Sequence, residues 1–198
     1  MFTQEPSFYC IDACSPNAAY DLSLEVVKMI SELGATYKKM VVLCIGTDRS
    51  TGDCLGPLVG YKLTSMYNFK GVDIFGTLDS PVHAKNLSSC IDKIYSSFSN
   101  PFIIAVDASL GKSENIGKIK LFKGPLYPGS GVNKTLTSIG DISITGIVNI
   151  SGYMEYMVLQ NTRLSIVMNM ADTIAHGLYL GLNFLLSKGS NISSISSS

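Results

Sequence analysis

Acidic side chains stand directly after two apolar stretches of this sequence. Residues 46–57 read Gly-Thr-Asp-Arg-Ser-Thr-Gly-Asp-Cys-Leu-Gly-Pro and follow the apolar run 40–45, and Asp107 follows the apolar run 101–106. Two carboxylates that converge in a fold can share a proton, bind a metal ion, or act as acid and base on one water molecule, because like charges held close push their pKa values apart. Asp53 and Asp107 are therefore the candidate catalytic pair.

Apolar runs of strand length alternate with helical patterns along the chain. The predicted strands span residues 41–45, 72–75, 101–106 and 142–150, with a short one at 118–122. The predicted helices span residues 22–33, 55–66, 82–95, 154–159 and 163–186. Strands that alternate with helices form βαβ units, so we predict an α/β fold with a central, mostly parallel sheet in three α-β-α layers. The carboxyl ends of such strands share one edge, where ligands bind, and both acids are expected there.

The chain is expected to form a single domain over residues 1–198, long enough to build a core without disulfides. Mixed polar residues before about position 20 and the Ser-rich stretch 187–198 predict mobile tails. The part between residues 111 and 141 is rich in Gly, Pro and Ser, and such a long loop in a compact domain is usually functional. We expect its stretch 124–131 to form a wall of the substrate groove.

Four further residues are candidate substrate-binding residues, namely Asp48, Arg49, Gly52 and His83. Arg49 and the backbone amides of the glycine-rich loop can orient a substrate carbonyl or carboxylate. A thiol hydrolase is an alternative, because Cys54 lies at a predicted helix N-terminus, where the helix dipole lowers a thiol pKa, and His83 is the one histidine in the first half of the chain.

Each of these residues also has a purely structural interpretation. Asp53 could cap the helix that follows it, and Asp107 could cap the turn after its strand. Asp48 and Arg49 could pair with each other or with solvent, and Cys54 could be a small buried apolar side chain. The spacing alone leaves these alternatives open.

Other patterns carry weaker signals. The glycine spacing of residues 46–57 is not that of a Walker sequence, and its Lys-Ser/Thr pair is absent, which disfavours an NTPase. Cys10 and Cys14 have no further Cys or His nearby and make a weak zinc signal. Asp172 and His176 share a face of a predicted helix, as a structural contact would.

The composition excludes several classes of protein. Fifteen basic and fifteen acidic residues cancel, so no nucleic-acid partner is expected. Five cysteines, an odd number without paired spacing, indicate a reducing cytoplasm. No apolar run approaches the roughly 20 residues needed to span a bilayer, so no membrane partner is expected either. Assembly into a homo-oligomer is left open.

Five motifs together resemble the YyaC family of sporulation proteins. They are residues 46–57, Gly-Thr-Leu-Asp-Ser-Pro-Val-His-Ala at 76–84, Val-Asp-Ala-Ser-Leu-Gly at 106–111, Gly-Pro-Leu-Tyr-Pro-Gly-Ser-Gly at 124–131 and Gly-Asp-Ile-Ser-Ile-Thr-Gly at 140–146. That family is distantly similar to the spore germination protease and to the hydrogenase maturation endopeptidases. The resemblance implies a phosphorylase/hydrolase-like, hydrogenase maturation peptidase-like α/β fold, and it implies that the chain acts in the cytoplasm of a sporulating cell.

The resemblance to those peptidases also concerns the two acids. At the positions of Asp53 and Asp107, the germination protease has aspartates implicated in catalysis, and the hydrogenase peptidases have acids that bind nickel together with a later histidine. The one histidine after Asp107 here is His176, which lies in no matching motif. Because imidazole is the ligand that suits nickel, we predict no metal and no cofactor, with a divalent metal at the two acids as the alternative.

The function expected from these observations is that of a sporulation-associated endopeptidase, a hydrolase of protein or peptide substrates. Asp53 and Asp107 would activate water for amide hydrolysis, one as a base and the other as a protonated acid. The alternative is a catalytically inactive scaffold with the same fold that binds a peptide or protein partner during sporulation.

Overall fold

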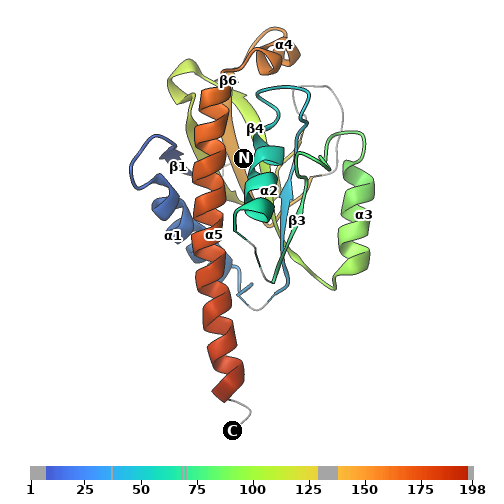
Figure 1. Cartoon of the computed structure of the whole chain (residues 1–198), viewed down its shortest axis with the longest axis vertical. Coiled ribbons are helices and arrows are strands. Elements are labelled where there is room, and N and C mark those ends of the chain that lie inside the picture. Colours follow the sequence, from blue (N-terminus) through green and yellow to red (C-terminus); the bar gives the residue numbers. More distant parts are fainter. Residues whose placement is uncertain (1–7, 37, 68, 70, 129–137, 196–198) are drawn as a thin grey trace, which may run out of the picture.

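The structure is a computed structural model that describes residues 8–36, 38–67, 69, 71–128 and 138–195, with the backbone alone for 188–195. Its elements alternate between strands and helices for most of the chain (Figure 1). In chain order they are β1 (Tyr9–Asp12), α1 (Ala18–Glu32), β2 (Met40–Cys44), α2 (Leu55–Ser65), β3 (Val72–Phe75), α3 (Leu87–Ser97), β4 (Phe102–Gly111), η1 (Ser113–Asn115), β5 (Lys118–Lys123), β6 (Ile142–Ile150), α4 (Glu155–Gln160) and α5 (Leu164–Ile195).

One sheet of six strands forms the centre, in the order β1-β5-β6-β4-β2-β3. The four strands from β6 to β3 are mutually parallel, whereas β5 and β1 add an antiparallel edge. The prediction of a central, mostly parallel sheet is therefore confirmed. The register places Cys44 of β2 beside Val106 of β4, so the acid-bearing segments leave neighbouring strands at the same edge.

Helices cover both faces of the sheet, which explains why β2 and the first half of β4 are apolar runs rather than alternating patterns. Consecutive residues of β2 face opposite cores: Val42 packs with α1, α2 and α5, whereas Val41 packs with α3. Figure 1 shows α5 passing along the first face and α3 alone on the other side. None of the helices in the described part of the chain combines the length and apolar character needed to cross a membrane.

The bounds of β4 and α3 differ from the predicted ones near the site. Strand β4 does not stop before Asp107 but continues to Gly111, because Asp107 and the residues after it pair with β6. Helix α3 begins at Leu87 rather than near residue 82, because Val82 instead forms a bridge to Ile45 at the end of β2.

The described parts of the two predicted tails contain regular structure. Within residues 8–20, β1 pairs with β5 with Ile11 buried, and α1 begins at Ala18, whereas residues 1–7 lie outside the described part of the chain. Helix α5 extends to Ile195, well into the stretch expected as the C-terminal tail.

The loop expected to wall the groove lies partly outside the described residues, which omit 129–137. Its described flanks form a bridge between Leu126 and Ile139, and both side chains are buried in the core on the α3 face.

Candidate functional site

The glycine-rich loop between β2 and α2 folds back on itself so that Asp53 returns to the end of β2. Gly46 has a φ of +144°, and a Cβ there would lie 2.0 Å from the carbonyl oxygen of Asp53. The Thr47 N–H donates to that same carbonyl at 3.1 Å. Only glycine permits this approach of two backbone segments, which fixes Asp53 above the strand end.

Asp107 reaches the same place from inside the sheet. The Ile45 N–H donates to the Val106 carbonyl at 2.7 Å, so the loop leaves β2 directly beside Asp107. The Asp107 side chain is 8% exposed, and its Oδ1 accepts a hydrogen bond from the Ala108 N–H at 2.8 Å. Burial raises the pKa of Asp107 well above its usual range, and the charge of Asp53 raises it further.

The surroundings of Asp53 shift its pKa in both directions. Burial raises its pKa, while the charge of His83 and a backbone hydrogen bond from Thr47 act in the opposite direction. Asp53 thus interacts electrostatically with His83 on one side and with Asp107 on the other. Asp107 is the deeper acid and the one that burial most strongly favours in its protonated form.

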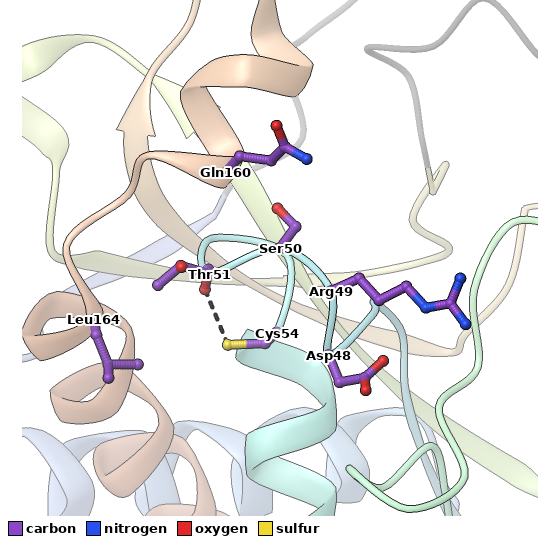
Figure 2. Close-up of a pocket in the computed structure, with 7 residues that line it drawn as sticks. All are labelled: Asp48, Arg49, Ser50, Thr51, Cys54, Gln160 and Leu164. Carbon is purple, nitrogen blue, oxygen red and sulfur yellow. Dashed lines mark hydrogen bonds between the residues drawn. The ribbon is translucent and has the colours of Figure 1, made fainter.

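Asp48 and Arg49 line a shallow pocket of about 440 Å³ (Figure 2), which also includes Cys54, the residue after Asp53. Its other lining residues are Ser50, Thr51 and Cys54 of the same loop, Gln160 of α4 and Leu164 of α5. Neither Asp53 nor Asp107 lines it, so this pocket and the acid pair are neighbouring but separate features. No ion pair joins Asp48 to Arg49, whose side chains are both exposed.

Gly52 takes part in a contact that the sequence did not indicate. Its N–H donates to the Leu159 carbonyl of α4 at 2.8 Å, and a Cβ there would lie 2.8 Å from Thr162 Oγ1. That amide is therefore engaged within the protein rather than directed at a substrate. No local pattern links positions 52 and 159, because the contact depends on how the chain returns after β6.

The contacts at the start of α2 bear on the structural interpretations of Asp53 and Cys54. Cys54, not Asp53, is the residue that precedes α2, and no side-chain hydrogen bond caps this helix. The Cys54 thiol is buried and lies 2.9 Å from the Thr51 carbonyl, while burial and the nearby Asp53 raise its pKa. A thiol nucleophile needs a lowered pKa, so this environment disfavours the thiol hydrolase.

The second histidine lies elsewhere. His176 stacks on Tyr67 with ring centroids 6.2 Å apart, and Asp172 pairs with Lys62 at 2.6 Å. Both contacts join α5 to the α2 side of the molecule and have no part in the acid pair. Among the residues that the structure describes, no group of three or more His, Cys, Asp or Glu side chains is arranged to hold a metal ion. The donor set does not fit a nickel centre.

Comparison with known proteins places the chain in a family. Residues 10–177 match a family described as a protein of unknown function, DUF1256. The chain belongs to this family. It is 51% identical over 164 residues to the uncharacterized protein YyaC of Bacillus subtilis (strain 168), a match that covers 83% of this chain and 80% of that protein. The resemblance to the YyaC family seen in the sequence is confirmed.

A solved structure shares the fold. The NiFe hydrogenase maturation protease HycI from Thermococcus kodakarensis KOD1 superimposes with a TM-score of 0.55 at 18% identity, covering 80% of this chain and 99% of that chain. Similarity at this identity shows the fold alone. The predicted maturation peptidase-like α/β fold is therefore confirmed.

Proposed function

We propose that this protein is a peptidase in which Asp53 and Asp107 activate a water molecule for attack on a peptide bond. The observation that carries the proposal is the pairing of a deeply buried carboxyl within β4 with a less buried one in the loop that leaves the end of β2, the parallel strand beside it. Two acids in different environments divide the roles of base and acid between them.

The proposed reaction begins with Asp53 ionised and Asp107 protonated. The water oxygen attacks the scissile carbonyl carbon, Asp53 takes a proton from the water, and Asp107 gives its proton to the carbonyl oxygen. The tetrahedral diol then collapses: Asp107 regains a proton from one hydroxyl, the carbon–nitrogen bond breaks, and the proton on Asp53 passes to the leaving nitrogen. Both acids return to their starting states.

The substrate in this proposal is a protein or peptide chain that crosses the edge of the sheet. Asp48 and Arg49 line the pocket beside the acids, and in this proposal they contact side chains that flank the scissile bond. The resemblance to sporulation proteins supports a role in the cytoplasm of a sporulating cell.

Cleavage of small spore proteins, followed by mass spectrometry, tests the proposal. Each of the variants Asp53→Asn and Asp107→Asn should lower the cleavage rate by about 100-fold or more, as expected for loss of a general acid or base. Asp92→Asn, a change on the exposed face of α3, is the matched control and should cleave like the wild type. Wild-type rates in either acid variant would contradict the two-acid mechanism.

A second candidate function is the inactive scaffold, and the surface around α4 favours it. Tyr153 is 97% exposed, and Tyr156 and Met157 are also exposed, so a group of large apolar side chains stands beside the candidate site. Exposed apolar groups of this kind mark interaction sites. Absence of wild-type cleavage from pH 4 to 8, together with binding of the same spore proteins, would support the scaffold over the peptidase.

A further inference from the structure

Backbone contacts hold the connection between β3 and α3 against the end of β2. Gly76 has a φ of +86°, and a Cβ there would lie 1.8 Å from the Cys44 carbonyl oxygen. Farther along, Val82 pairs with Ile45, and its carbonyl accepts the Gly46 N–H at 2.8 Å. The residue after Val82 therefore stands at the edge of the sheet where the loop of Asp53 begins.

That residue is His83, and a compact turn holds its backbone. The His83 N–H donates to Asn86 Oδ1 at 2.8 Å, and the Asn86 Nδ2 group donates to the Pro81 carbonyl at 3.0 Å. The Asn86 N–H and the Leu87 N–H both donate to the His83 carbonyl, at 3.0 and 2.9 Å. These bonds leave the backbone of His83 little freedom.

One nitrogen of the imidazole ring already accepts a hydrogen bond. The Lys85 N–H donates to His83 Nδ1 at 3.3 Å, which assigns the proton of the neutral ring to Nε2. Nε2 is then the ring atom that can donate to a carboxylate, or carry additional positive charge toward it when the ring is protonated.

The segments that carry Asp53 and His83 both form hydrogen bonds with the backbone of residues 46–47. Gly46 donates to the carbonyl that precedes His83, and Thr47 donates to the carbonyl of Asp53. In agreement with this placement, His83 lowers the pKa of Asp53 against the effect of burial. The other titratable groups of the site are Asp107 from β4 and, in the loop itself, Asp48 and Cys54.

We propose that His83 is a positioning residue that keeps Asp53 in its ionised form, so that the one proton of the acid pair resides on Asp107. This inference rests on the proposed function for its catalytic meaning, because it decides which acid is the base. Its physical content, the coupling of His83 to Asp53, can be measured without any substrate.

The test is an NMR titration of the protein labelled with ¹³C at the aspartate carboxyl carbons, with the Asp53 signal assigned from Asp53→Asn. In His83→Ala the titration midpoint of Asp53 should move to higher pH, because the favourable interaction with the ring is lost. His176→Gln, at the histidine stacked on Tyr67, is the control and should leave the midpoint unchanged. An unchanged Asp53 midpoint in folded His83→Ala protein would overturn the inference.

A second variant covers the case in which His83→Ala fails to fold. His83→Gln keeps a side chain that can donate a hydrogen bond but cannot carry charge, so the titration midpoint of Asp53 should again move to higher pH. If that midpoint does not move in the folded variant, the two groups are not coupled and the inference is wrong. If the coupling is found but no substrate is cleaved, the inference holds and the peptidase proposal fails.

Where cleavage is observed, the pH profile supplies a further readout. His83→Gln keeps a donor group but cannot ionise, and the acid limb of its kcat/KM profile should shift to higher pH, with a smaller loss than the roughly 100-fold expected for either acid. A lowered kcat/KM without movement of that limb would indicate a merely structural residue and contradict the role proposed for His83.

Discussion

Replacing Asp107 by Asn should make the protein more stable at neutral pH while removing its proposed activity. The Asp107 side chain is 8% exposed, and burial is the largest cause of its raised pKa. The charged form is therefore costly in the folded protein. Asn is neutral at every pH and keeps a side-chain oxygen for the hydrogen bond from the Ala108 N–H.

The free-energy cost of keeping the Asp107 carboxyl protonated sets an upper limit on the gain in stability. An unfolded Asp has a pKa of about 3.9, and each unit of difference from pH corresponds to about 1.4 kcal/mol, so keeping the folded carboxyl protonated at pH 7 costs at most about 4 kcal/mol. The new amide hydrogens, if left unpaired, cost about 1 kcal/mol or more. We therefore expect Asp107→Asn to raise the free energy of unfolding at pH 7 by roughly 1 to 3 kcal/mol.

The sign of the pH dependence follows from the raised pKa. Because the folded protein holds the Asp107 proton more tightly than the unfolded chain, wild-type stability falls as pH rises from about 4 toward the folded pKa of Asp107. The advantage of Asn should be absent near pH 3 and should grow as the pH increases. Urea unfolding followed by circular dichroism at several pH values measures both the size and the trend.

Asp92→Asn, on the exposed face of α3, is the control and should show no comparable gain. A lower stability of Asp107→Asn at pH 7, or a difference from the wild type that does not change between pH 3 and pH 8, would refute the argument that burial of this carboxyl dominates its energetics.

Three other predictions concern contacts around the site. Gly52→Ala should lower stability by about 1 to 3 kcal/mol in urea unfolding, because its Cβ would press on backbone and side-chain oxygens of the α4 region, and unchanged stability would contradict that close packing. Asp172→Asn should lower the melting temperature, since it removes the partner of the largely buried Lys62 ammonium, and an unchanged melting temperature would show that this ion pair contributes nothing. In the native protein, iodoacetamide with peptide mapping should label exposed Cys10 well before Cys54, whose pKa burial raises; equal rates would reopen the thiol hydrolase.

Strands with long apolar runs were predictable from the sequence, because both of their faces are buried. The bounds of β3 and β6 agree with the prediction at both ends. Strand β1 was missed, since four residues at an edge, with Ile11 alone buried, carry too little pattern to be recognised. The continuation of β4 past Asp107 was missed for a related reason: pairing with β6 makes it a strand, and no continuous apolar run accompanies that pairing.

Some features of the site could be predicted from the sequence and others could not. The acids at the ends of two apolar runs could be named from the sequence, because parallel strands in this topology release their carboxyl ends at one edge. The roles of Gly52 and His83 could not. Gly52 contacts Leu159, which is more than a hundred positions away. His83 lies next to the start of the loop of Asp53 only because backbone contacts of Gly76 and Val82 hold its segment against the end of β2.

By itself, the sequence determined the fold class and the two candidate acids, since apolar periodicity and the residues that end each apolar run are local properties of the chain, and its motifs carried the resemblance to the family. The tertiary structure alone decided how those acids differ. Asp107 lies within a buried strand and Asp53 lies in a loop beside His83, and a carboxyl's preference for its proton depends on burial and neighbouring charge, which arise only when distant segments pack together.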